Sequence, residues 1–362
     1  MKIFNIFLKV NLLLVVVLLS SCKDDSTNPS NKNSNSSPTD QTLDCTNGGA
    51  VYLDTNGVTI KACPDAQVGD TGVINGNIYI VADNQILQEA SYLKNTDWTK
   101  YCTTRVTKFE GMRFGNMEEI NYEPFNQPIG NWDISNFTDL DGLFSGCEEF
   151  NQPLDHWDVS NVTDMSTLFY QATTFNQDIS NWNVSNVKNM SWMFYYSKKF
   201  NQPIGDWNTS KVLSFFRMFQ GAEKFNQPIG DWNTSNVTDM YLMFKEATSF
   251  NQPINNWDVS NVTIMELLFD DAINFNQDIS NWDVSNVTIM SGLFQGAENF
   301  DQPIDNWDVR NVTLMTNMFY RAANFNQDLS QWCVSNFKNR PDNFSYKSGL
   351  TPENHPVWGT CP

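Results

Sequence analysis

The sequence predicts an α/β solenoid that is built from 25-residue strand–helix repeats and preceded by a small β-rich N-terminal cap. Two series of aromatic residues carry this prediction, because each recurs at an interval of 25 residues without a slip. The series are Phe125, Phe150, Phe175, Phe200, Phe225, Phe250, Phe275, Phe300 and Phe325, and Trp132, Trp157, Trp182, Trp207, Trp232, Trp257, Trp282, Trp307 and Trp332. A fixed period of about 20 to 50 residues is typical of stacked-repeat architectures.

The hydrophobic spacing within one repeat, residues 150–174, predicts its secondary structure. Trp157 and Val159 alternate with polar residues, which is the period of a short half-buried strand. Apolar residues at helical spacing follow, namely Val162, Met165, Leu168, Phe169 and Ala172. We therefore expect each repeat to consist of a strand, a corner, one short helix and a return turn.

A single repeat has too few apolar residues to offset the backbone entropy that is lost on folding. Stacking on neighbouring repeats supplies the missing burial, and we expect the strands to pair in one continuous parallel sheet. Asn126 and Gln127 recur with the same period, with one replacement at Asp301. We expect these two series to form side-chain ladders at the return turn, since buried polar groups need partners.

The repeat resembles a known family. Ile129-x-x-Trp132-x-Ile134 is similar to the strand half of a leucine-rich repeat, and the fuller string FNQ-x-I-x-x-WDVSNVT-x-M-x-x-LF-x-x-A resembles the repeat of BspA-like leucine-rich-repeat surface proteins of bacteria. This resemblance implies a leucine-rich-repeat-like solenoid with an adhesion role. Val162 stands where leucine-rich repeats have a buried Asn, which leaves Asn126 and Gln127 as the expected ladder.

The N-terminus predicts export and lipid attachment. Residues 1–21 have the apolar run of a secretory signal peptide. The following Cys22 resembles the lipidated Cys of bacterial lipoproteins, and Lys23-Asp24-Asp25 resembles an export tag of surface-displayed lipoproteins. Residues 22–43 are polar and predict a disordered tether. These features imply a lipid anchor in a bacterial outer membrane, with the chain exposed at the cell surface.

The remaining domain boundaries follow from where the period begins and ends. Residues 44–98 do not repeat, and they contain two hairpin signals and a helical pattern over 84–94, which together predict a β-rich cap. Residues 99–124 align as a degenerate first repeat, residues 125–349 form the solenoid and residues 350–362 form a C-terminal cap.

Cysteines in an exported chain favour disulfides. Cys45 and Cys63 bracket the first hairpin, and Cys333 lies in the last repeat while Cys361 ends the tail, so we expect these to be the two pairs. Cys147 occupies a column of Ala residues and is expected to be a buried thiol. The sequence has no Cys-x-x-Cys and only two His, which argues against zinc.

The outward residue between the inward Trp and Val of each repeat is the candidate binding face. Its acidic members are Asp133, Asp158, Asp258, Asp283 and Asp308, with His156 and Arg310 as variable neighbours. This face is open to three interpretations: a solvated acidic surface bonded to nearby backbone, a recognition surface for a protein or glycan, or a calcium ladder or glycosidase carboxylate pair. Near-identical copies of one Asp do not provide two differently tuned carboxylates.

The sequence therefore predicts a non-enzymatic, cofactor-free surface lipoprotein whose solenoid binds an extracellular protein or serves adhesion. The alternative is a glycan-capturing accessory protein that depends on calcium. The formal net charge of −19 excludes a basic footprint for nucleic acid.

Overall fold

The computed structural model describes residues 45, 49–93, 95–108, 114 and 124–362. The chain divides into residues 1–41 and 42–362, and the description below concerns the second unit. The predicted signal peptide, Cys22 and the tether lie outside the described residues.

Two hairpins form the predicted β-rich region before the repeats. Strand β1 (Val51–Leu53) pairs antiparallel with β2 (Ile60–Ala62), and β3 (Thr71–Ile74) pairs antiparallel with β4 (Asn77–Val81). The turn of the second hairpin contains Asn75 and Gly76, both with positive φ, which suits Asn-Gly turns. Both predicted hairpins are confirmed.

The predicted helix is also present, as α2 (Asn84–Ser91), and it ends before the predicted limit of 94. Asp83 caps its N-terminus by accepting a hydrogen bond from the backbone N–H of Ile86. A 3₁₀ turn, η1 (Trp98–Lys100), leads into β5 (Tyr101–Cys102), which adds to β4 in parallel. This third strand was not predicted, because two residues give no alternation to detect.

The repeats contain turns where a helix was predicted. Residues 124–362 are all described, and the helical element among them is a 3₁₀ turn in the tail, η2 (Pro352–Asn354). In residues 150–174, Leu168 N–H donates to Met165 O at 3.3 Å and Ala172 N–H donates to Phe169 O at 3.0 Å. Two consecutive turns thus replace the predicted helix, and because they recur every four residues they leave the same apolar spacing.

The pairing between repeats also lies elsewhere than predicted. Single parallel bridges link each repeat to the next, in a series that runs from Lys108 through Asp139 and Asp164 to Leu314. In the same segment, Thr167 N–H donates to Ser191 O at 3.0 Å and Phe169 N–H to Met193 O at 2.9 Å. The predicted strand at 157–159 is wrong, because backbone groups there close corner turns instead.

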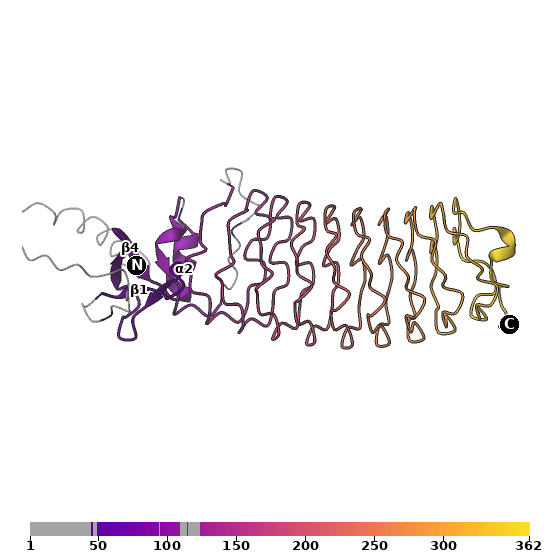
Figure 1. Ribbon diagram of the computed structural model, residues 1–362, viewed down its shortest axis with the longest axis horizontal. Helices are drawn as coiled ribbons and strands as arrows, with labels where there is room; N and C mark the ends of the chain where they lie inside the picture. The colour runs from indigo at the N-terminus through magenta and orange to yellow at the C-terminus, as the bar shows by residue number, and fades with distance from the viewer. Residues whose placement is uncertain (1–44, 46–48, 94, 109–113, 115–123) are drawn as a thin grey trace, which may run out of the picture. The chain divides into compact units, whose positions relative to one another are not determined.

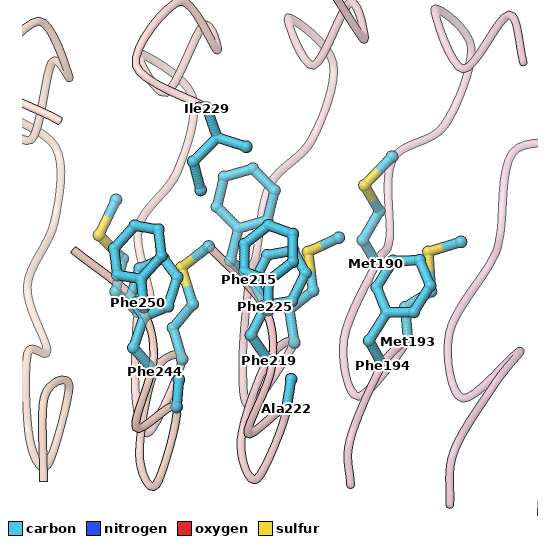
Figure 2. Packing of buried hydrophobic residues seen from close by; sticks show 14 of the residues in the cluster. Met190, Met193, Phe194, Phe215, Phe219, Ala222, Phe225, Ile229, Phe244 and Phe250 are labelled. Atoms are coloured by element: carbon cyan, nitrogen blue, oxygen red, sulfur yellow. The ribbon is translucent and has the colours of Figure 1, made fainter. Parts of the chain in front are cut away.

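We call each 25-residue repeat a coil, and Figure 1 shows the coils of residues 125–349 following one another in chain order. Their interior is aromatic. The Phe219 and Phe225 rings stack at 3.9 Å between centroids, and Phe244 and Phe250 repeat the arrangement at 4.1 Å in the next coil (Figure 2). Every Trp of the predicted series is at most 3% exposed.

The predicted Asn–Gln ladder is confirmed. Asn226 Oδ1 accepts hydrogen bonds from Asn251 N–H at 2.9 Å and from Gln252 Nε2 at 3.1 Å. Asp301, the one replacement in this series, accepts from Asn326 N–H at 3.0 Å and Gln327 Nε2 at 2.8 Å. The ladder therefore needs an oxygen acceptor at this place, and either side chain supplies it.

The tail packs on the last coil. Cys333 and Cys361 form a disulfide, with Cα atoms 4.0 Å apart, and Val334 N–H donates to Thr360 O at 2.9 Å. Leu350 is buried against the interior of the stack. The last coil thus buries its apolar residues without a following repeat.

Candidate functional site

The predicted acidic face consists of side chains that bond their own turn. We call residues 25 apart in successive coils a column and name each column after its member in residues 150–174. In the Asp158 column, Asp158 Oδ1 accepts from Ser160 N–H at 3.0 Å and Asn183 Oδ1 accepts from Ser185 N–H at 3.2 Å. Asp258 and Asp283 bond Ser260 N–H and Ser285 N–H in the same way, at 3.0 Å each. Asn and Asp are interchangeable here because the turn uses an oxygen acceptor.

At two members of this column, Asp258 and Asp308, the contacts favour the ionised carboxylate. The Ser260 hydroxyl and N–H lower the pKa of Asp258, and the Arg310 guanidinium lowers the pKa of Asp308. Arg310 bonds Asp308 through Nε at 2.8 Å. Of the seven predicted face residues, these two are the pair that the structure joins directly.

One member of the predicted face differs from the expectation. Asp133 is 3% exposed, so its assignment to an outward binding face is wrong. Thr104, from the segment before the first coil, covers it and donates to Asp133 Oδ2 at 2.7 Å. His156 is exposed, as its outward position predicts, and its Nε2 lies 3.5 Å from Asp155 Oδ2.

A second amide ladder, not predicted, runs along this corner. Asn161 Nδ2 donates to Ser135 O at 2.7 Å, and Asn186 Nδ2 donates to Ser160 O at the same distance. The column is interrupted at Lys211, whose Nζ donates to Asn186 Oδ1 at 2.6 Å. The repetition of Asn in this column was the sequence signal from which the ladder could have been predicted. The polar residues of this corner therefore hold neighbouring coils together.

Four columns in which most residues are half-buried differ from coil to coil, and sequence reasoning did not single them out. They are named after Ser166, Thr167, Tyr170 and Gln171. The Ser166 column contains Asp141, Ser166, Ser191, Phe216, Tyr241, Glu266, Ser291 and Thr316, and the Thr167 column contains Gly142, Thr167, Trp192, Arg217, Leu242, Leu267, Gly292 and Asn317. The buried column next to them is Phe in every coil from Phe144 to Phe319. A constant interior therefore carries a variable surface.

Aromatic residues gather in these columns over four consecutive coils. We call these aromatic residues, together with one Arg among them, the aromatic strip. Its members are Tyr170, Trp192, Tyr195, Phe216, Arg217 and Tyr241. The Tyr170 and Tyr195 rings stack with centroids 4.6 Å apart, and Trp192 meets the Tyr195 ring edge to face at 4.8 Å. Phe216 lies 5.4 Å from Trp192 and 5.3 Å from Tyr241. The rings are thus in continuous contact along the stack.

Arg217 lies at the centre of the aromatic strip. Its guanidinium carbon is 4.5 Å from the centroid of Trp192, 5.4 Å from Phe216 and 5.3 Å from Tyr241. These distances are those of cation–π contacts. Its Nε is buried and makes no hydrogen bond in the structure. The strip therefore holds its charge by ring contacts.

A hydrogen bond across two coils ties the coil of residues 175–199 to the coil of residues 225–249, which carries the last ring of the strip. Tyr196 OH donates to Glu246 Oε2 at 2.6 Å, although the two residues are 50 apart in the chain. Gly221 lies on the coil between them, and a Cβ there would come within 2.7 Å of the Tyr196 ring. Burial and the bond to Glu246 raise the pKa of Tyr196 well above its usual range, so it stays protonated and donates.

In the coils of residues 225–249 and 250–274, the Tyr170 and Gln171 columns contain charged residues. Lys245 forms ion pairs with Glu246, at 3.3 Å, and with Asp270, which is 1% exposed. Burial raises the pKa of Asp270, while Lys245 opposes that effect. Gln295 Nε2 donates to Asp270 Oδ1 at 2.8 Å. Asp270 is therefore a structural carboxylate, and Glu266 and Asp271 are the half-exposed ones beside it.

Both predicted disulfides are confirmed. Cys45 and Cys63 pair with Cα atoms 5.8 Å apart. Cys333 of the last coil pairs with Cys361 of the tail. Cys147 is buried as expected. Cys102 is also buried, with Sγ 3.4 Å from Ile60 O, and burial raises the pKa of its thiol. A raised pKa leaves the thiol protonated and unreactive.

The part of the chain that the structure describes contains no group of three or more His, Cys, Asp or Glu that could hold a metal ion. Among the same residues, no helix has the length and apolar character needed to cross a membrane.

The coil-to-coil contacts define a tandem-repeat protein in which each unit hydrogen-bonds to the next. A family model described as "Mycoplasma protein of unknown function, DUF285" matches three consecutive segments, residues 82–196, 177–272 and 252–355. These segments span well over half of the chain, which therefore belongs to this family. No curated protein and no solved structure matches the chain.

Proposed function

We propose that the protein is a non-enzymatic surface lipoprotein whose repeats form a leucine-rich-repeat-like solenoid that binds an extracellular protein. The observation that carries this proposal is the contrast between columns. The Phe169 column is constant and buried, while the four columns beside it, most of whose members are half-buried, vary from Gly to Trp. A constant interior that displays variable side chains is the arrangement by which repeat proteins recognise partners.

The BspA-like assignment within this proposal rests on the repeat string and agrees with tandem matches to a repeat family. The adhesion role is what that resemblance implies. The acidic face contributes little to the proposal, because Asp158 and Asp258 bond their own turns and Asn replaces them in other coils.

Attachment to a bacterial outer membrane through Cys22 is the second part of the proposal, and it rests on the sequence around that residue. A lipid chain on Cys22 would hold the repeats at the cell surface through the polar segment 23–43. Cys22→Ser is expected to move the chain from the membrane fraction to the soluble fraction. Unchanged fractionation would contradict the anchor and leave the binding proposal to its own test.

The binding proposal is tested by presenting the whole chain, purified in detergent micelles, to purified extracellular-matrix proteins and to neutral polysaccharides. We expect saturable binding to at least one protein, without a requirement for calcium. Binding to polysaccharide alone, abolished by a chelator, would instead support a calcium-dependent glycan-capturing protein. Turnover of a glycan that one Asp→Asn change abolishes would contradict the non-enzymatic assignment.

A further inference from the structure

We propose that the aromatic strip and the carboxylates beside it and on the next coil form one docking surface for a protein segment that carries both apolar and Lys or Arg side chains. We call Glu246, Glu266 and Asp271 the acidic extension. This inference rests on the proposed binding function and assigns it a place on the molecule and a class of partner.

The fold does not require aromatic residues in the strip. In the Ser166 column, Phe216 and Tyr241 occupy places that Ser191 and Ser291 occupy in other coils. In the Thr167 column, Trp192 replaces residues as different as Gly292 and Asn317. The other coils have the same turns and the same buried Phe. Stack stability therefore does not explain why the large rings gather in four neighbouring coils.

The ring geometry favours a protein partner over a sugar. A sugar stacks on an open aromatic face, but the Tyr170 and Tyr195 rings cover one another at 4.6 Å and an interplanar angle of 12°. Arg217 covers a face of Trp192 at 4.5 Å. These ring faces are thus used for contacts within the strip. Trp, Tyr and Arg are the residues that dominate the binding energy of protein interfaces.

The strip is also held in place before binding. Each ring contacts the next, and Tyr196 reaches across Gly221 to Glu246 at 2.6 Å. A preorganised surface loses less side-chain entropy when it binds. The same tie fixes the strip relative to the acidic extension, so an extended segment that lies along the stack meets both.

Charge indicates the chemistry of the partner's second half. Glu246 lies on the last coil of the strip, and Glu266 and Asp271 lie on the next coil, all three in the same four columns. The chain has a formal net charge of −19. Lys245 offsets part of this charge, since it pairs with Glu246 and Asp270. A basic segment complements what remains, and electrostatic complementarity accelerates association and excludes acidic partners.

The experiment measures binding of three synthetic 15-residue peptides to the whole chain in detergent micelles: one of alternating Leu and Lys, one of alternating Leu and Glu, and one of alternating Ser and Lys. We expect the Leu–Lys peptide to bind at least tenfold more tightly than either of the others. The strip variant combines Trp192→Asn, Phe216→Ser and Tyr241→Ser, each taken from the same column of another coil. It should lower the affinity for the Leu–Lys peptide at least tenfold.

Two further variants separate a docking surface from general attraction. Glu266→Ser with Asp271→Gly removes two charges beside the strip, and both replacements occur in the next coil as Ser291 and Gly296. The matched control removes charges elsewhere by Asp158→Asn and Asp258→Asn, as in the Asn183 coil. The first variant should weaken binding several-fold, and the control should leave it within about twofold.

Equal losses in the two charge variants, or an unchanged affinity in the strip variant, would overturn the docking surface. Neither result would contradict protein binding found with matrix proteins, so the two proposals fail separately. Failure of the Leu–Lys peptide to bind the unaltered chain would overturn the partner class. If the unaltered chain binds neutral dextran and the strip variant does not, the strip binds a glycan, and the proposed partner class is overturned as well.

Discussion

The indole Nε1 of Trp232 donates a 3.0 Å hydrogen bond to the carbonyl oxygen of Ile204, on the preceding coil. The same bond recurs in every coil from Trp157 to Trp332, always to the residue 28 positions earlier. Trp is thus used in this column both to fill the interior and to join two coils. Phe or Leu would satisfy only the first requirement.

Trp232→Ala is expected to lower the free energy of unfolding by about 3–5 kcal/mol, because it leaves a cavity and removes the hydrogen bond. Trp232→Phe retains most of the volume and should cost less, with about 0.5–1.5 kcal/mol from the lost bond. Urea titration followed by circular dichroism measures both. Unchanged stability of Trp232→Phe would show that the indole N–H contributes nothing.

Asn226→Asp and Asn226→Ala separate the ladder from simple packing. Asp301 already accepts both hydrogen bonds in its own coil, so Asn226→Asp should unfold within about 0.5 kcal/mol of the unaltered protein. Asn226→Ala leaves Asn251 N–H without its acceptor and should cost about 1–2 kcal/mol. Similar stability of the two variants would contradict the ladder.

Gln171 and Gly221 occupy one column, and both have positive φ, 56° and 69° respectively. A side chain in this region costs about 1–2 kcal/mol. Gln171→Gly is therefore expected to raise the free energy of unfolding by up to about 1 kcal/mol. Gly221→Ala should lower it by more than that, because its Cβ would also meet the Tyr196 ring. Thermal unfolding of both variants tests the sign of each effect.

Acid should weaken the turn that Asp258 closes. The pKa of Asp258 is lowered in the folded chain, so this carboxylate contributes stability above the pKa of the unfolded chain. That contribution is lost as the pH falls below the ordinary Asp pKa of 3.8 and through the lower folded pKa of Asp258. Asp258→Asn keeps the acceptor and should reduce the loss of stability over this range. An unchanged pH profile would contradict a role for the ionised carboxylate.

The sequence predicted what depends on the period and missed what depends on backbone conformation. Phe and Trp columns require burial wherever they recur, so the interior could be inferred. The recurrence of Asn126 and Gln127 likewise indicated the ladder, and the positions of the cysteines indicated the two disulfides. The helix could not be distinguished from turns, because Met165, Leu168, Phe169 and Ala172 have the same spacing in both. Nothing about Thr167 signals a φ of 50°, which β-branched residues rarely adopt.

The aromatic strip was missed for a different reason. The sequence pattern favoured the outward residue between Trp157 and Val159 as the binding face, but the side chain of this residue accepts a hydrogen bond within its own turn. Comparing the members of one column from coil to coil would have revealed the strip. Phe216 and Trp192 stand out only when they are set beside Ser191 and Gly292. Their mutual contact then depends on side chains 24 residues apart in the chain, which spacing alone does not place.

The central claim is that each coil is held by hydrogen bonds to the next, and hydrogen–deuterium exchange of the whole chain tests it most directly. In the coil of residues 225–249, Leu242 N–H donates to Glu266 O at 3.1 Å and Phe244 N–H donates to Leu268 O at 2.9 Å. We predict slow exchange at both amides, and faster exchange there and in the two flanking coils after Trp232→Ala. Exchange at the rate of an unfolded chain in the unaltered protein would contradict the stack.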